Sequence, residues 1–165
     1  MYCNGNPICQ NDLADVSWNM EPNGECYGKK IVRKSIESSL QKSDIGMEYE
    51  TISEKFRLTP ERFDRKYIHL SGERWRAACA YGYAQGKKIF FAPYEPSRFY
   101  YCMCSSSLLI ALRALTSSGA LVILPTGSDD FIKHIADEVV YLNRDYDIES
   151  LKDFYSEQSG ENWIK

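Results

Sequence analysis

The chain has 165 residues, which is enough for one domain or for one domain with a small attached lobe. Apolar residues make up 44% and charged residues 26%, as in a folded protein with a single core. The net charge of −3 and the pI near 5.5 speak against the clustered positive field that non-specific nucleic-acid binding needs, so we expect no nucleic-acid partner.

Hydropathy argues against direct insertion into a membrane. No stretch approaches the roughly 20 apolar residues that a bilayer-spanning helix needs. Residues 1–5 have neither the basic cluster nor the apolar core of a secretory signal. We therefore expect a cytoplasmic protein that meets a membrane only through a partner.

The cysteines are scattered, and the two histidines, His69 and His134, lie near none of them in the sequence. A zinc site would need paired Cys or Cys/His clusters, and a disulfide framework would need an oxidising compartment. We predict reduced structural thiols and no metal site. The six thiols are Cys3, Cys9, Cys26, Cys79, Cys102 and Cys104.

The first part of the chain predicts loops and then helices. Residues 1–30 are rich in Asn, Gly and Pro, with one short strand possible around residues 7–9. Apolar spacing predicts helices over residues 31–42 and 47–58. Thr59 and Pro60 are typical of an N-cap and a first helical position, so a new helix should start there. Residues 31–69 are thus a predicted helical lobe.

From residue 70 onward, predicted helices alternate with continuous apolar strands. Such alternation indicates a mostly parallel sheet covered by helices on both faces. Ser71 is a candidate N-cap and Gly86 a terminator of the first helix. The predicted strands are residues 89–92, 120–124 and 139–142, and the predicted helices are 72–85, 104–117, a short one after Ser128, and 147–158.

Four segments in this region share an order and spacing with a known family. They are Leu70-Ser71-Gly72-Glu73, then Ile89-Phe90-Phe91-Ala92-Pro93-Tyr94-Glu95-Pro96, then Ala120-Leu121-Val122-Ile123-Leu124-Pro125-Thr126-Gly127, and the stretch 131–142. They resemble the signature (LSGGQ, here one glycine short), the Walker B strand, the switch strand and the following segment of the ABC-transporter nucleotide-binding domain. Gln10, which follows Pro7-Ile8-Cys9, resembles the Q-loop glutamine.

The resemblance implies an α/β fold, with the mostly parallel sheet of a RecA-like P-loop ATPase core and a small helical lobe. The implied division is residues 1–30 as a loop-rich start with the Q-loop-like segment, 31–69 as the lobe, and 70–165 as the core half, all in one compact domain. The Walker A strand is missing. Without it, residues 120–124 and 139–142 either pair directly or leave a gap that another chain fills.

The sequence departs from the family where nucleotide is held. No G-x-x-x-x-G-K-[ST] occurs within the 165 residues, Tyr94 stands at the Walker B aspartate position, and Gly127 stands at the switch histidine position. The resemblance leaves Glu95 at the catalytic carboxylate position. It leaves nucleotide-binding positions to Gln10, Ser71, Gly72 and Glu73. The plainer alternatives are local pairing for Glu95, an ordinary loop glutamine at Gln10, and a helix cap at Ser71.

We therefore expect an ABC-ATPase-like protein that is inactive on its own and binds another protein, either a membrane permease or an ABC ATPase. Self-association is a further expectation. The isolated chain should neither bind ATP–magnesium tightly nor hydrolyse it; no cofactor is expected, and ATP and magnesium would be held only if a partner completed the site. Two alternatives stay open: half of a split ATPase whose partner supplies Walker A, and a stand-alone regulatory or immunity-like module.

Overall fold

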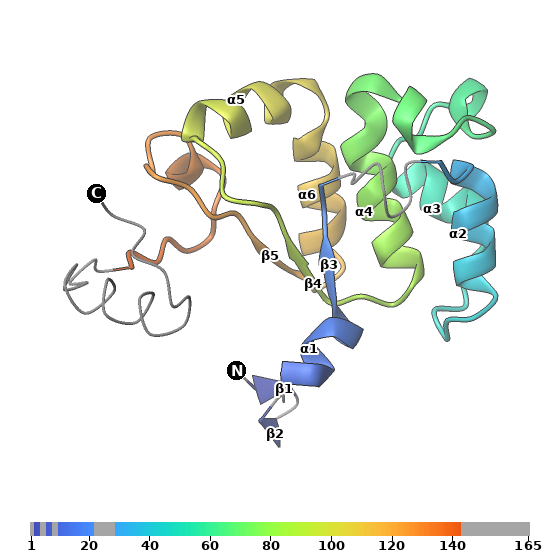
Figure 1. Cartoon of the computed structure of the whole chain (residues 1–165), viewed down its shortest axis with the longest axis horizontal. Helices are drawn as coiled ribbons and strands as arrows, with labels where there is room; N and C mark the ends of the chain where they lie inside the picture. The colour runs from blue at the N-terminus through green and yellow to red at the C-terminus, as the bar shows by residue number, and fades with distance from the viewer. Residues whose placement is uncertain (1, 4–5, 8–9, 22–28, 143–165) are drawn as a thin grey trace, which may run out of the picture.

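The computed structural model describes residues 2–3, 6–7, 10–21 and 29–142 (Figure 1). A first antiparallel pair joins β1 (Tyr2–Cys3) to β2 (Asn6–Pro7), close to the short strand predicted around residues 7–9. Helix α1 (Gln10–Val16) then leads into the main sheet. The predicted helix over residues 147–158 lies outside the described residues.

The main sheet has three parallel strands in the order β3 (Ser17–Asn19), β4 (Ile89–Phe91) and β5 (Leu121–Ile123). The predicted strands at residues 89–92 and 120–124 are thus confirmed as parallel neighbours. The prediction of a third strand at 139–142 is wrong. That segment has no regular structure, and Val140, Tyr141 and Leu142 are exposed.

Strand β3 takes the third place, although its sequence is only Ser-Trp-Asn. Tertiary contacts of Trp18 hold it in the sheet. The indole Nε1 donates a hydrogen bond to the Ala78 carbonyl oxygen at 2.9 Å, and the ring meets Tyr81 edge-on at 5.2 Å. The indole also lies so close to Gly82 that a Cβ there would have no room. A short polar strand therefore depends on one aromatic anchor.

The helical lobe contains α2 (Val32–Leu40) and α3 (Tyr49–Lys55), which confirms the helices predicted over residues 31–42 and 47–58. The restart at Pro60 is a 3-10 turn, η1 (Pro60–Arg62), rather than an α-helix. Thr59 holds the N-cap position, but its hydroxyl makes no capping bond to the backbone and contacts Glu73 instead. A second 3-10 turn, η2 (Tyr67–His69), ends the lobe.

The central helix is α4 (Arg74–Ala84), which lies between α2 and α6 (Figure 1). It begins after a 3-10 turn, η3 (Ser71–Glu73), and Ser71 makes no capping bond, so the predicted cap is wrong. Its terminator is Gly86, whose φ of 80° is the left-handed geometry that glycine adopts at low cost. Alanines make α4 narrow enough to be buried nearly all round.

The helix predicted over residues 104–117 is two helices, α5 (Ser97–Ser106) and α6 (Leu108–Thr116), which are bent by 88°. The break is at Ser107, whose hydroxyl donates to the Gly72 carbonyl oxygen. Within the described residues no single helix has the length and composition of a membrane span; α5 and α6 match those criteria only when taken as one bent pair. The core-facing side of α6, which includes Leu108, Leu112 and Leu115, is buried in the protein. The apolar composition of α6 is therefore explained by its place in the core.

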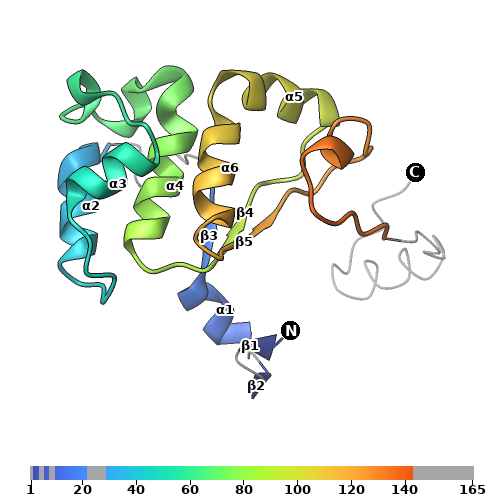
Figure 2. The same cartoon turned by 180° about the vertical axis from the view of Figure 1, so that it is seen from behind.

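The two faces of the sheet differ. Trp18, Phe90 and Val122 are in register, and all three pack with the hydrophobic core that includes α4 and α6. Figure 2 shows these two helices beside the sheet from behind. On the other face, Leu121 is 51% exposed, Ile123 38% and Phe91 36%. The described helices therefore cover one face, and the prediction that both are covered is wrong for this part of the chain. The short helix predicted after Ser128 is a single 3-10 turn, η4 (Ile132–His134).

Candidate nucleotide-type site at the carboxyl ends of the strands

The loops that follow β4 and β5 run side by side beyond the ends of the strands. Ala92 donates its backbone N–H to the Ile123 carbonyl oxygen at 3.1 Å, and Glu95 donates to that of Pro125 at 3.2 Å. Glu95 also forms a parallel β-bridge with Thr126. In open parallel sheets, ligands bind outside the carboxyl ends of the strands. Glu95 therefore lies at the edge where a ligand site is expected.

The side chain of Tyr100 connects these two loops through its hydroxyl group. Its ring is fully buried, and its hydroxyl donates to the Pro93 carbonyl oxygen at 2.8 Å, with the Pro125 carbonyl oxygen at 3.4 Å. Burial raises the pKa of the Tyr100 hydroxyl, and the negative charge of Glu95 raises it further. Tyr100 thus stays neutral at physiological pH and ties the two loops together. No motif in the sequence singled out Tyr100, because its role depends on two loops that are distant in sequence.

The two positions at which the family carries its Walker B aspartate and switch histidine contact each other. The Tyr94 hydroxyl lies against Gly127, leaving no room for a Cβ there. A tyrosine and a glycine supply neither the carboxylate that magnesium prefers nor an imidazole. Within the described residues no group of three or more His, Cys, Asp or Glu side chains could hold a metal ion. These donors therefore do not fit a magnesium-bound triphosphate.

The predicted signature segment lies at the start of α4, beside the junction of α5 and α6. Ser71 and Gly72 are exposed, and Ser71 has a φ of 49°, which is costly for a residue with a side chain. Glu73 is engaged differently. Its carboxylate accepts hydrogen bonds from the Thr59 hydroxyl and from Arg76 Nη2, the latter at 2.7 Å, and Arg62 Nη1 lies 3.7 Å away. Glu73 therefore joins the lobe to α4, while Ser71 and Gly72 face solvent.

We predict that Glu73→Ala lowers the free energy of unfolding by about 2 kcal/mol, because it leaves the largely buried guanidinium of Arg76 without its acceptor. Urea denaturation followed by circular dichroism would measure the loss. Glu61→Ala, at an exposed position in η1, is the matched control and should change stability by less than about 0.5 kcal/mol. Equal effects of the two substitutions would contradict a joining role for Glu73.

Gln10 lies apart from the other predicted site residues. It is the first residue of α1, which precedes β3, whereas Glu95 follows β4. Because β3 and β4 are parallel, Gln10 and Glu95 lie at opposite ends of the sheet (Figure 1). At the carboxyl end of β3 stand Asn19 and Met20, and Met20 donates its N–H to the Phe91 carbonyl oxygen at 2.8 Å. Only recognition of β3 as a strand would have pointed to these residues.

The structure describes three of the six cysteine side chains. Cys79 and Cys104 are buried free thiols, and Cys102 is exposed. Burial raises the pKa of Cys104 to about 11 and raises that of Cys79 as well. At neutral pH both therefore remain protonated and behave as small apolar side chains. The side chains of the other three cysteines lie outside the described part.

Similarity to known proteins is found in the structure but not in the sequence. Neither a family model nor a curated protein matches the sequence. A solved structure is similar: CbiO1 from Clostridium perfringens, part of the ABC transporter complex cbiONQ, with a TM-score of 0.56 and 15% sequence identity. The alignment covers 81% of this chain and 58% of that one. The protein has an ABC-ATPase-like fold.

That likeness extends to the fold alone. It confirms the expected α/β class, a parallel sheet with flanking helices, for the part of the chain that is described. The chain spans 58% of the length of CbiO1. What the aligned protein binds or assembles with is therefore a property of CbiO1, and the roles of Glu95, Ser71, Gly72, Glu73 and Gln10 remain predictions.

Proposed function

We propose that this protein acts by binding another protein chain through the β5 side of its sheet, and that its ABC-ATPase-like fold is a binding scaffold rather than an ATPase. The observation that carries the proposal is the apolar face formed by Phe91, Leu121 and Ile123, named here the open face. Strands of a parallel sheet are usually buried on both faces. An open face on such a sheet is typical of a surface that a partner covers.

The outer edge of β5 supports the same interpretation. Strand β5 pairs with β4 on one side, and no described strand pairs with its other side. A strand edge with unpaired N–H and C=O groups readily accepts a strand from another chain. Side chains of the open face then decide which partner fits. The edge and the open face together offer both backbone hydrogen bonds and apolar area.

The chemistry of the described site favours binding over catalysis. Phosphoryl transfer depends on metal ions, a lysine and backbone N–H groups that hold the triphosphate. Glu95 stands at the expected edge, but Tyr94 and Gly127 supply no charge, and the sequence contains no phosphate-binding loop motif. CbiO1 is part of an ABC transporter complex. The partner that we propose is therefore a transporter permease or an intact ABC ATPase. With such a partner we propose that the protein works in the cytoplasm beside a membrane.

A charge on the open face tests this proposal. We predict that Ile123→Lys abolishes binding to the partner and any self-association of the purified protein, because it introduces a charge into an apolar interface. Light scattering at high micromolar concentration would report self-association. Pairwise titration against each purified permease or ABC ATPase subunit of the same organism would report partner binding.

The matched control is Ile68→Lys, since Ile68 is an apolar lobe residue that is also half exposed, at 50%. This variant should associate as the unmodified chain does. A clean monomer of the unmodified chain that binds none of the candidate subunits would reject the proposal. Equal loss of association in both variants would show that net charge, and not the open face, is responsible.

A second candidate function is half of a split ATPase. The exposure of Ser71 and Gly72 and the place of Glu95 at the carboxyl end of β4 favour it. In that case ATP hydrolysis would appear only when the partner supplies a phosphate-binding lysine, and Glu95→Gln would remove it without weakening partner binding. A complex that binds but shows no ATP hydrolysis above that of the partner alone would reject this second candidate.

A further inference from the structure

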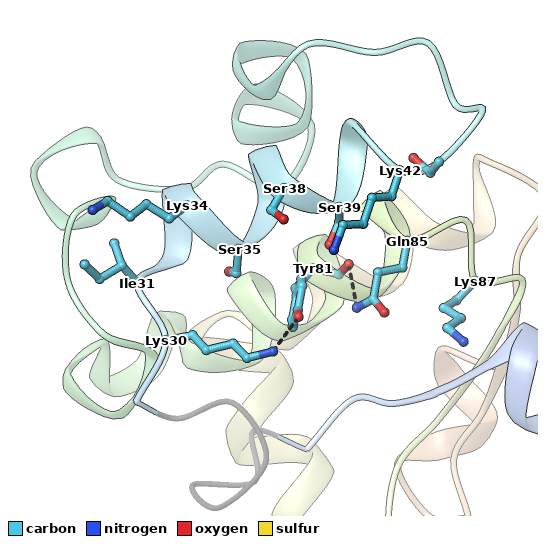
Figure 3. A pocket seen from close by; sticks show the side chains of 11 residues that line it. Lys30, Ile31, Lys34, Ser35, Ser38, Ser39, Lys42, Tyr81, Gln85 and Lys87 are labelled. Atoms are coloured by element: carbon cyan, nitrogen blue, oxygen red, sulfur yellow. Dashed lines mark hydrogen bonds between the residues drawn. The ribbon is translucent and has the colours of Figure 1, made fainter.

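A groove between the helical lobe and α4 carries concentrated positive charge. It has a volume of about 630 Å³ and lies between α2 and the carboxyl-terminal half of α4 (Figure 3). Four lysines line it: Lys30, Lys34, Lys42 and Lys87. We name it the lysine groove.

The positive charge of the lysine groove is not compensated within the described residues. Among the described residues, no Asp or Glu lines the groove, and none of the four lysines forms a salt bridge with a described carboxylate. The lobe does pair other cations, since Arg33 lies within 4.0 Å of three carboxylates. The chain as a whole carries a net charge of −3. Four lysines without a described carboxylate partner line one hollow and form a local positive field, which attracts anions.

Two of the lysines are held by neutral acceptors. Lys30 Nζ donates to the Tyr81 hydroxyl at 2.9 Å, and this pair is seen in Figure 3. Lys87 Nζ donates to the carbonyl oxygens of Ala14 at 3.1 Å and Asp15 at 2.7 Å, at the end of α1. These partners fix the positions of the ammonium groups without cancelling their full charge. Lys30 thus gives the groove one ordered cation beside Tyr81 before any ligand arrives, while Lys87 Nζ is turned toward the end of α1.

The other two lysines come from one side of the groove. Lys34 and Ser38 are four residues apart on α2, and Lys42 lies four residues further, in the turn after the helix. Residues four apart lie on the same helical face. In Figure 3 the Lys42 side chain extends toward Ser39, and the Lys34 side chain extends outward near the beginning of α2. Both lysines are exposed, so they can swing onto a ligand. The hydroxyl of Ser38 adds a neutral donor between them.

From this arrangement we propose that the lysine groove binds a small molecule carrying two or more phosphate groups, without a metal ion. Ammonium groups are compact point charges that suit phosphate oxygens. Lysines from separate segments, rather than one cluster, match an anion whose charge is spread over several groups. The volume lies within the range of small-molecule pockets, about 300–1,000 Å³. Among the residues that the structure describes, no carboxylate lines the groove to help hold magnesium, so we expect the anion to bind in its metal-free form.

Calorimetric titration of the full chain with inorganic pyrophosphate and tripolyphosphate, in magnesium-free buffer, tests the proposal. We expect saturable binding at one site, tighter for tripolyphosphate, and weakened about tenfold or more in Lys34→Gln/Lys42→Gln. The control is Lys66→Gln/Lys133→Gln, which removes the same charge from exposed positions outside the groove and should retain the affinity. Thermal melts of both double variants confirm that each is folded.

Several outcomes would overturn the proposal. One is the absence of saturable binding at a Kd below about 1 mM. Another is equal weakening in the two double variants, which would show a response to net charge alone. Added magnesium should lower the affinity because it neutralises the free anion, so tighter binding with magnesium would also reject a metal-free groove. The groove is tested with Ile68 and Ile123 unchanged, so failure here leaves the proposed partner binding untouched.

Discussion

Leu112→Asp is expected to leave the chain unable to fold. Leu112 lies on α6 and is only 8% exposed, within the cluster that packs α6 against α4 and the sheet. A buried charge without a partner costs several kcal/mol, which is comparable with the whole stability of a domain, about 5–15 kcal/mol. Circular dichroism and the yield of soluble protein would measure the result: loss of the cooperative melt and recovery only as aggregate.

The adjacent residues Val122 and Ile123 supply a control within one strand. Val122 is half-buried on the helix-covered side, and Ile123 is on the open face. Successive residues of a strand point to opposite faces, so the two positions differ chiefly in burial. Ile123→Asp should fold and melt cooperatively, whereas Val122→Asp should be severely destabilised. Soluble, cooperatively melting Leu112→Asp and Val122→Asp proteins would contradict the assignment of the core.

Trp18→Ala is expected to lower the free energy of unfolding by about 3 kcal/mol, as for the removal of a large aromatic side chain from a packed site. The indole contacts Gly82 closely, donates to the Ala78 carbonyl oxygen and packs edge-on against Tyr81. Its loss removes the anchor that holds β3 beside β4. Urea unfolding followed by far-ultraviolet circular dichroism would measure the change. Trp18→Phe, which keeps an aromatic ring, should cost less.

A double-substitution cycle with Gly82 sharpens this prediction. Gly82→Ala alone should destabilise the protein, because the added Cβ meets the indole ring. In a Trp18→Ala background the ring is gone, so the same substitution should be neutral or stabilising, since alanine favours a helix more than glycine does. The two effects should therefore be non-additive by more than 0.5 kcal/mol, as expected for residues in direct contact. Additive effects would contradict the close approach of Trp18 and Gly82.

Several elements could be predicted because their local pattern and their tertiary environment agree. The apolar run from Ile89 to Ala92 and the run from Ala120 to Leu124 are too short for helices, and each is stopped by a proline. Both are strands in the expected parallel pair. Helices α2 and α3 follow their apolar spacing in the same way.

Other predictions failed because the structure of the segment depends on whether a distant part of the chain pairs with it. Residues 139–142 have the composition of a strand, yet no described strand pairs with them, and Val140, Tyr141 and Leu142 are exposed. The helix predicted over residues 104–117 is broken at Ser107, whose hydroxyl donates to the Gly72 carbonyl, 35 residues away in sequence. Neither outcome is encoded within a short window of sequence, because each depends on which distant group lies nearby.

The candidate sites, like the fold, could be predicted only in part from the sequence. Sequence alone placed Glu95 after a buried strand, found Tyr94 and Gly127 where the family has charged ligands, and established that no phosphate-binding loop motif occurs in these 165 residues. The sequence alone did not indicate that Gln10 lies at the opposite end of the sheet from Glu95 or that Glu73 pairs with Arg76. Nor did it indicate that four lysines line one groove. The types and order of the residues are read directly from the sequence, and they determine which chemical groups are available. Which groups meet depends on tertiary packing, such as that of β3 on α4, where the Trp18 ring lies against Gly82.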